Sequence, residues 1–228
     1  MKILVISDIH SNYPALKAVL DRDGNDADLI VCAGDVVHLG YFPHEVLDAF
    51  RKYNVHAVCG NHDKEILHAP LTPESNPFVK YTRDNLTPED WEYLKALPNN
   101  YCFEADGISY CMRHAYGICE NVNNFLLSFI DHRSISEFDR IWRYASPVRG
   151  AKYRCIILGH SHESSIIKVS EHRMVVNPGT VAFHLGENAR RNYGADYMVI
   201  ENGVPSMKYV DYDHSEDIKR AKEAALYG

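Results

Sequence analysis

Apolar stretches alternate with segments of helical spacing in the first part of the chain. The apolar stretches cover residues 2–7, 28–35 and 55–63, and each has the length of a buried strand. Between them, residues 13–21 and 42–53 repeat apolar side chains at the period of a helix. Strands that alternate with helices need crossover connections, which are almost always right-handed. The pattern therefore predicts a largely parallel sheet that is covered on both faces.

The middle of the chain predicts helices. Residues 87–98 open with a capping box, in which Thr87 is the N-cap and Asp90 is the third helical residue. A similar capping box, Ser134 to Glu137, precedes another helical segment.

Short strand-like runs return in the last third of the chain. They cover residues 155–160, 164–169, 173–179, 195–203 and 205–210, and a surface helix is expected at 215–228. Because turns join these runs, they predict an antiparallel or mixed sheet. No repeat or low-complexity linker divides the sequence, which favours one domain.

Polar side chains follow each of the three early strands at the point where the strand ends. Asp8 and His10 come after the first strand, Asp35 ends the second, and Asn61 and His62 close the third. In α/β sheets, ligands bind at the carboxyl ends of the strands. We therefore expect these side chains to meet at one edge of the sheet.

Four short motifs carry the polar residues. They are Asp8-Ile9-His10, Gly34-Asp35, Gly60-Asn61-His62-Asp63 and Gly159-His160-Ser161-His162. Carboxylate, amide and imidazole together suit Mn, Fe, Zn, Co or Ni better than Ca, which prefers oxygen alone. Asp35 could bridge two ions, which lie about 3.5–4 Å apart in two-metal hydrolytic sites.

In this order, the four motifs resemble those of the calcineurin-like metallophosphoesterase superfamily. The resemblance spans nearly the whole chain, including "NPGT" at 177–180, and is closest to small bacterial and archaeal phosphodiesterases and dinucleoside tetraphosphate hydrolases. It implies an α/β fold, a four-layer α/β/β/α sandwich of two mixed sheets flanked by helices. We expect one domain over residues 1–228, with a helical insertion around 115–150 that walls the active-site cleft.

The resemblance also implies a two-metal centre. One ion would be held by Asp8, His10, Asp35 and His162, and the other by Asp35, Asn61, His160 and one further histidine. His114 is the expected further histidine, because it follows the strand-like run 107–112 as the family's ligand does, whereas His68 and His132 do not. Mn or Fe is the expected metal, with Zn, Ni or Co as alternatives. Ala115 follows His114 where relatives often have glycine, and this departure bears on the substrate more than on the ligand.

The resemblance further implies the catalytic roles. A hydroxide that bridges the two metals would attack phosphorus in line, and His62 would be the general acid, with Asp8 or Asp63 as its partner. Candidate substrate contacts are His38, Arg113 and Tyr116, although each residue type is common at protein surfaces without such a role. Arginine is absent just after Gly34-Asp35, which counts against a Ser/Thr protein phosphatase.

Composition limits the function further. The net charge of −7 disfavours general binding to nucleic acids, and no apolar stretch is long enough to cross a bilayer. The short apolar start does not resemble a signal peptide, and the six cysteines are scattered, so we expect a cytoplasmic protein with reduced thiols. The first hypothesis is a phosphoesterase that hydrolyses small phosphodiesters or nucleotide phosphoanhydrides such as dinucleoside polyphosphates. The alternatives are a phosphomonoesterase, including a phosphotyrosine-preferring protein phosphatase, and a non-catalytic metal-binding scaffold.

Overall fold

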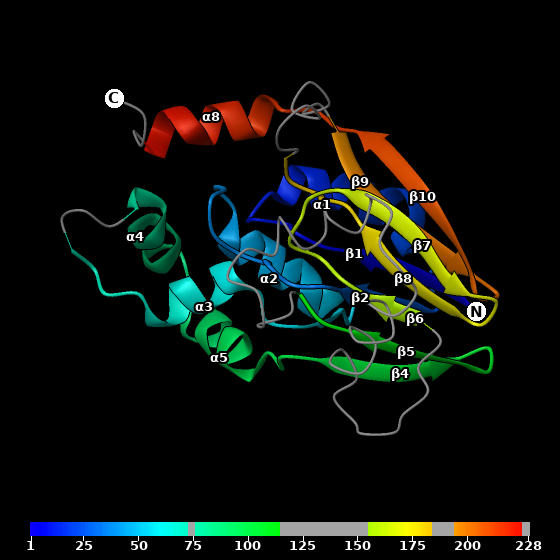
Figure 1. The fold of residues 1–228 in the computed structure, drawn as a ribbon. Coiled ribbons are helices and arrows are strands. Elements are labelled where there is room, and N and C mark those ends of the chain that lie inside the picture. The colour runs from blue at the N-terminus through cyan, green and yellow to red at the C-terminus, as the bar shows by residue number, and fades with distance from the viewer. Residues whose placement is uncertain (73–75, 115–154, 184–193, 225–228) are drawn as a thin grey trace.

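Two five-stranded sheets form the centre of the molecule (Figure 1). The computed structural model describes residues 1–72, 76–114, 155–183 and 194–224. The predicted helical insertion, the Ser134–Glu137 capping box and Tyr116 lie outside these residues.

The first sheet, sheet A, has the strand order β10-β9-β1-β2-β3. Its strands are β1 (Lys2–Ile6), β2 (Leu29–Cys32), β3 (His56–Ala57), β9 (Gly194–Glu201) and β10 (Val204–Asp211). The first three strands pair in parallel, as the alternation of strands and helices predicts. β9 runs antiparallel to both β1 and β10, so the sheet is mixed.

The third predicted strand is wrong in its length. β3 covers two residues, and residues 61–63 form the first turn of helix α3 (Asn61–His68). The physical reason is a cap: the side chain of Asp63 accepts the backbone N–H of Gly60 at 2.8 Å and so starts the helix.

The second sheet, sheet B, has the order β4-β5-β6-β8-β7. Its strands are β4 (Tyr101–Ala105), β5 (Ile108–Met112), β6 (Cys155–Ile157), β7 (Ser164–Ser170) and β8 (Arg173–Pro178). β5, β6 and β8 are parallel neighbours, whereas β4 and β7 pair antiparallel at the two edges. The expected antiparallel or mixed sheet is therefore a mixed one.

Helices flank the sheets. They are α1 (Tyr13–Val19), which continues into a π-turn at Leu20–Gly24, α2 (Pro43–Lys52), α3, α4 (Pro77–Asp84), α5 (Pro88–Ala96) and α8 (Ser215–Ala224). The predicted capping box of α5 is confirmed, because Thr87 and Asp90 exchange hydrogen bonds. Two mixed sheets flanked by helices confirm the predicted α/β sandwich.

Strand β1 shows how the layers are held together. Leu4 and Ile6 pack with α1 and α2 in one apolar core. Ile3 and Val5 point to the opposite face, since side chains alternate along a strand, and pack with residues of sheet B in a second core. β1 therefore contacts the helices with one face of sheet A and sheet B with the other.

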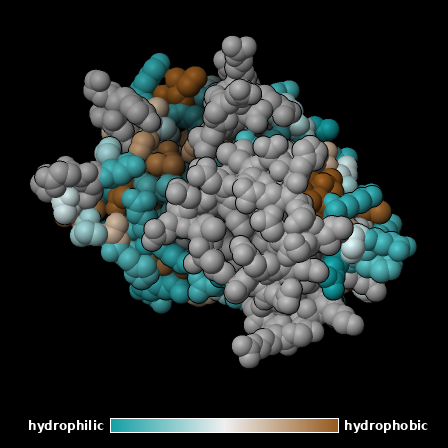
Figure 2. Space-filling model, viewed as in Figure 1, coloured by the Kyte–Doolittle hydropathy of each residue, from teal (hydrophilic) through white to brown (hydrophobic). Residues whose placement is uncertain are grey.

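The surface fits a globular protein of ordinary composition. On the face drawn in Figure 2, the described residues are mainly hydrophilic, and hydrophobic residues form small separate groups. In the part of the chain that the structure describes, the cysteines are free. None of the described helices has the length and apolar character that a membrane span requires.

Candidate metal centre

Seven predicted ligands meet where strands of both sheets end. The seven are Asp8, His10, Asp35, Asn61, His114, His160 and His162. The first four follow the ends of β1, β2 and β3 in sheet A. The last three, all histidines, follow the ends of β5 and β6 in sheet B. Six of the seven fall in groups of three whose donor atoms lie within 4.8 Å of one another, and Asn61 contacts two of those histidines. The strand ends therefore place the residues together as the sequence predicts.

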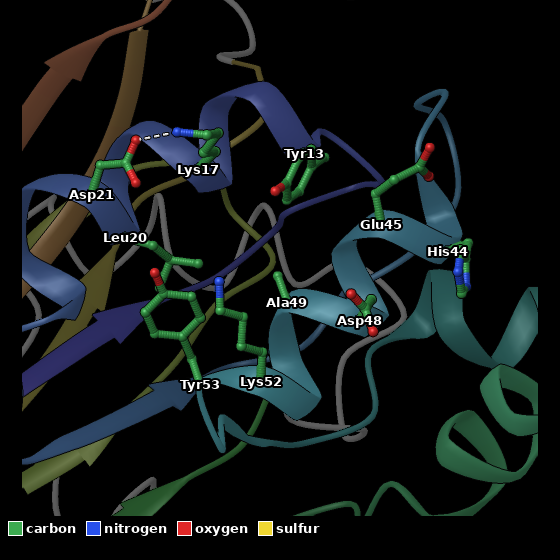
Figure 3. Close-up of a pocket in the computed structure, with 10 residues that line it drawn as sticks. All are labelled: Tyr13, Lys17, Leu20, Asp21, His44, Glu45, Asp48, Ala49, Lys52 and Tyr53. Atoms are coloured by element: carbon green, nitrogen blue, oxygen red, sulfur yellow. Dashed lines mark hydrogen bonds and ion pairs between the residues drawn. The ribbon is translucent and has the colours of Figure 1, made fainter.

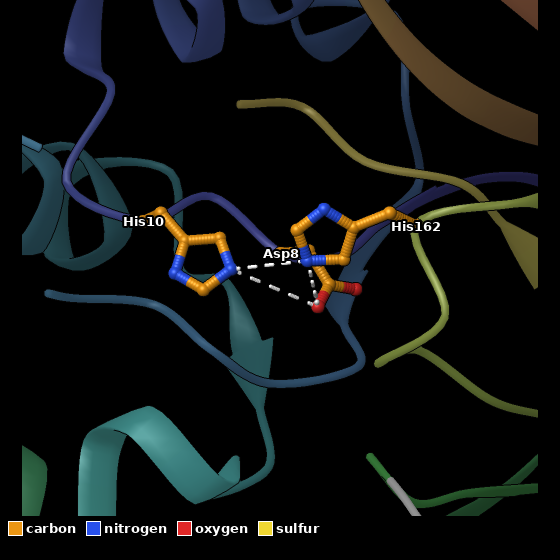
Figure 4. A group of neighbouring side chains, drawn as sticks. All are labelled: Asp8, His10 and His162. Carbon is orange, nitrogen blue, oxygen red and sulfur yellow. Dashed lines mark hydrogen bonds and ion pairs between the residues drawn. The ribbon is translucent and has the colours of Figure 1, made fainter. Parts of the chain in front are cut away.

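Asp8, His10 and His162 form the first group (Figure 4). Nε2 of His162 lies 3.3 Å from Oδ1 of Asp8 and 3.2 Å from Nε2 of His10. The second oxygen of Asp8 accepts the backbone N–H of His160 at 3.0 Å. One carboxylate oxygen is thus held by the backbone, and the other faces the histidines.

The second group contains Asp35, Asn61, His114 and His160. Nε2 of His114 lies 3.1 Å from Oδ2 of Asp35 and 3.0 Å from Oδ1 of Asn61. Nδ1 of His160 lies 2.8 Å from the same amide oxygen. Oδ2 of Asp35 is also 3.8 Å from Nε2 of His10, so this carboxylate lies between the two groups.

Two backbone carbonyls fix which ring nitrogen faces the centre. Nδ1 of His114 donates to the carbonyl of Ala33, and Nδ1 of His162 donates to the carbonyl of Phe183, each at 2.8 Å. Nε2 of each ring is therefore the nitrogen that faces the centre and that would bind a metal. The ring of Phe183 also packs, at tilted angles, against the rings of His162 and His10, a contact that the sequence analysis missed.

Burial and neighbouring charge shape the protonation of these groups. Burial lowers the pKa of His10 to about 3, so this ring is neutral. Burial also lowers the pKa of His114, but the charge of Asp35 outweighs it and raises the pKa to about 9. Although burial raises the pKa of Asp35, the charge of His114 and its hydrogen bond bring it well below the usual range. Burial likewise raises the pKa of Asp8, but its hydrogen bond to His162 and the charge of His114 bring that pKa below the usual value. Asp8 and Asp35 are therefore two buried, ionised carboxylates beside imidazoles.

The backbone around the centre is strained. Left-handed φ angles occur at five of the seven candidate ligands, namely Asp8, His10, Asp35, His160 and His162. Such angles cost on the order of 1–3 kcal/mol for residues with side chains, and they concentrate at functional sites. The surrounding hydrogen bonds compensate for this cost. For example, Asn177 of the "NPGT" segment donates to the carbonyl of Gly159, which precedes His160.

Two motif glycines allow the ligands to approach closely. A Cβ at Gly60 would lie 2.0 Å from Oδ1 of Asp35, and one at Gly159 would lie 2.1 Å from Oγ of Ser7. Since real Cβ atoms essentially never come this close, both positions require glycine. These contacts explain the Gly-Asn and Gly-His pairs in the motifs.

The donor set fits metal ions. Two ionised carboxylates in a buried site need compensating positive charge. Two nitrogens that bind one metal at about 2.0–2.1 Å are separated by roughly 2.8–3.4 Å for octahedral to tetrahedral angles. The nitrogen pairs His10–His162 and His114–His160 are 3.2 and 3.3 Å apart. Separations of this size suit pairs of ligands on a shared ion.

His62 lies beside the centre, but its neighbours differ from the expected ones. Its Nδ1 is 2.8 Å from Nδ1 of His38 and 3.5 Å from Oε2 of Glu65. Asp63, one of the two expected partners, instead accepts the backbone N–H groups of Val36, Val37 and Gly60. Asp8, the other expected partner, is directed at the first ligand group.

Arg113 and His68 were the other candidates that the structure describes. Arg113 is partly buried and directly precedes His114, while His68 ends α3 and belongs to none of the ligand groups.

A separate groove of about 240 Å³ lies between α1 and α2 (Figure 3). It is lined by charged and tyrosine side chains, and none of the seven candidate ligands is among them.

The strand order, the strand-end donors and the two carboxylate-histidine groups define a metallophosphoesterase fold. The model of the calcineurin-like phosphoesterase superfamily domain matches residues 1–200, and the chain belongs to this superfamily.

Individual relatives resemble the chain over almost its whole length. An uncharacterised protein of Methanocaldococcus jannaschii, MJ0912, is 27% identical, with 97% of this chain and 90% of that protein covered. The crystal structure of a metallophosphoesterase from Sphaerobacter thermophilus is 24% identical with a TM-score of 0.72, covering 100% of this chain and 95% of that one. The hypothetical protein PH1004 from Pyrococcus horikoshii is 21% identical with a TM-score of 0.75, covering 99% and 94%.

Proposed function

We propose that the chain is a dimetal-dependent hydrolase of small phosphodiesters or nucleotide phosphoanhydrides, with dinucleoside polyphosphates as the model substrate class. The observation that carries this proposal is the complete set of seven donors, delivered from both sheets to one place. A scaffold that had lost catalysis would be expected to lack a ligand or the candidate acid.

The donors divide into two metal positions. We assign one ion to Asp8, His10, Asp35 and His162, and the other to Asp35, Asn61, His114 and His160. Mixed oxygen and imidazole ligands suit Mn, Fe, Zn, Ni or Co, and of these the resemblance to the superfamily favours Mn or Fe. Bound metals would activate water at neutral pH and neutralise the phosphoryl oxygens.

The chain itself would supply the proton that the leaving group needs. His62 follows the ligand Asn61, and its ring lies 4.9 Å from that of His10, centroid to centroid. When the P–O bond breaks, its electron pair stays on the leaving oxygen, and an N–H of protonated His62 passes its proton to that oxygen. Neutral His62 then regains a proton from water.

The sequence around the centre counts against a phosphoserine or phosphothreonine protein as the substrate. Residues 36–42, which follow Asp35, contain no arginine to grip a phosphate bidentately. The net charge of −7 favours a small substrate over a long nucleic acid. Arg113 and Tyr116 remain proposed substrate contacts, whereas the fully buried side chain of His38 contacts His62.

The test is a comparison of three substrates on the metal-free protein after addition of Mn²⁺ or Fe²⁺. A phosphomonoester, a phosphodiester and a dinucleoside tetraphosphate are assayed with the wild type, with His62→Asn and with His172→Asn. His172 is a matched control, because its side chain is 73% exposed. We expect metal-dependent turnover, greatest on the diester or the tetraphosphate, that falls about 10²-fold or more in His62→Asn alone.

Other outcomes would redirect the proposal. Preference for the monoester would favour a phosphomonoesterase. Stoichiometric metal binding without turnover of any of the three substrates would favour a metal-binding scaffold.

A further inference from the structure

A second cluster of ligand-type side chains borders the metal centre. It consists of His38, His62 and Glu65, whose donor atoms lie within 4.8 Å of one another. Glu65 lies one helical turn after His62 on α3, and its Oε2 is 3.5 Å from Nδ1 of His62 and 3.6 Å from Nδ1 of His38. The cluster is separate from the seven residues assigned to metals.

The short distance between the two rings fits a hydrogen bond. Nδ1 of His38 and Nδ1 of His62 are 2.8 Å apart. This lies within the normal range of an N–H hydrogen bond, and at the lower limit of the roughly 2.8–3.4 Å expected for two nitrogens on one ion. The nitrogen pairs of the metal centre are longer, at 3.2 and 3.3 Å. We therefore interpret His38 and His62 as a hydrogen-bonded pair with a carboxylate beside it.

His38 is held more rigidly than a surface histidine. Its side chain is fully buried, its backbone has a φ of 83°, and its N–H donates to Oγ of Ser11 at 3.0 Å. Burial and the neighbouring His62 lower the pKa of His38 to about 4. A neutral imidazole has one nitrogen without a proton, which can accept a hydrogen bond.

We propose that His38 is a positioning residue for His62, and that its Nδ1 accepts the Nδ1–H of His62. This bond leaves Nε2 of His62 as the nitrogen that carries the transferable proton. Among the described residues, the structure shows no hydrogen bond to that Nε2, so the nitrogen is available to a substrate. Oε2 of Glu65 lies 3.5–3.6 Å from Nδ1 of both rings and limits their movement. The role in catalysis rests on the proposed function, whereas the direction of the hydrogen bond does not.

The first measurement is a long-range ¹H–¹⁵N correlation spectrum of the histidine rings, recorded with Zn²⁺ as a diamagnetic metal. We expect a proton on Nδ1 of His62 and a bare Nδ1 on His38, and we expect His38→Leu to remove the protection of the His62 proton. A bare Nδ1 on His62 in the wild type would overturn the proposal. Because this readout needs no turnover, it decides the hydrogen bond even if the proposed activity is absent.

The second measurement compares two diesters that differ in their need for an acid. Thymidine 5′-(4-nitrophenyl phosphate) releases a stable nitrophenolate, whereas the dinucleotide TpT releases an alcohol that must be protonated. We expect His38→Leu to lower kcat on TpT about tenfold or more, with little change in KM, in bound metal or in the nitrophenyl reaction. His38→Asn should recover most of the loss, because asparagine offers an acceptor oxygen and tolerates a left-handed backbone.

Glu65→Gln is a second variant in case His38→Leu does not fold. Because the side chain of Glu65 is 39% exposed, its replacement should leave the fold intact. Glu65→Gln should show a smaller loss of kcat than His38→Leu, with the same dependence on the leaving group. His172→Asn, at an exposed position, should show no loss of kcat. Equal losses on both diesters, or a loss of bound metal in His38→Leu, would overturn the positioning role and leave a structural one.

Discussion

Asp35 contacts both groups of candidate ligands at once. Its Oδ2 faces His10 on one side and His114 on the other, and its Oδ1 accepts the backbone N–H of His62 at the start of α3. A negative charge is favourable there, since the N-terminus of a helix carries partial positive charge. Replacing this residue should therefore affect both metal positions.

We expect Asp35→Asn to bind less than one equivalent of metal per chain. The variant keeps the size of the side chain but removes the charge that both ions need. Turnover should fall by more than the roughly 10–100-fold that loss of an outer-shell partner costs. Elemental analysis of the protein after loading with Mn²⁺ checks this, and Asp48→Asn is the control because its carboxylate is 69% exposed. Retention of two equivalents would contradict the assignment of Asp35 as a bridge.

Metal binding should become tighter as the pH rises from about 6.5 to about 8.5. In the metal-free protein, the raised pKa of His114, about 9, means that its ring holds a proton that a metal must displace. One released proton strengthens binding by up to about tenfold per pH unit below that pKa. Titration calorimetry with Mn²⁺, in two buffers of different ionisation enthalpy, measures both the affinity and the proton release. Affinity that does not change with pH would contradict the raised pKa of His114.

The sequence predicted that the seven candidate ligands lie close together, because strand ends and glycine-containing motifs are visible in the residues themselves. The neighbours of those ligands were harder to find. Glu65 follows His62 at helical spacing, which becomes informative only once the helix α3 is recognised. Phe183 belongs to no periodic pattern, and its contacts with His10 and His162 arise from folding across the chain.

Among the secondary-structure elements, two hairpins could have been predicted from their turn residues. Asp106-Gly107 joins β4 to β5, and Asn202-Gly203 joins β9 to β10. All four residues have left-handed φ angles, as two-residue hairpins with type I′ turns require. The Asp-Gly dipeptide would have predicted β4, which the sequence analysis did not identify. Helix α3 was missed for another reason, since its first turn continues an apolar strand without a break.

The junction of β3 and α3 should not tolerate a methyl group. Gly60 has an ordinary φ of −89°, so Gly60→Ala adds little backbone strain, but the new Cβ would meet Asp35 at its Oδ1 and its backbone nitrogen. We expect metal content and turnover to fall as in Asp35→Asn. Gly107→Ala is the matched control, because it has a left-handed φ of 70° and nothing within 4 Å of a Cβ. Its metal content should stay at the wild-type level, with a stability loss of about 1 kcal/mol.

At the scale of the whole molecule, the candidate centre joins the two sheets. Asp8 and Asp35 come from sheet A, whereas His114 and His162 come from sheet B. An ion bound by both sheets stabilises their contact, in addition to the apolar core between them.

Removal of metal should therefore lower the melting temperature of the protein. A free metal concentration of 100 Kd stabilises the folded state by about 2.7 kcal/mol per site, which corresponds to roughly 5–10 °C for a chain of this length. Differential scanning calorimetry with Mn²⁺, and again after dialysis against a chelator, measures the shift. Asp35→Asn should show little or no shift, and an equal shift in that variant would indicate that the metal acts elsewhere.

The division of the centre between two sheets also sets an order of events during synthesis. His10 and His162 are 152 positions apart, so the ribosome makes the donors of sheet A long before those at the end of β6. Before sheet B is synthesised, the candidate donors available to an ion are two carboxylates, one amide and His10, which is an incomplete set. The full centre exists only when both sheets have formed. The metals available to the finished protein, rather than those near the ribosome, should therefore determine which ions it carries.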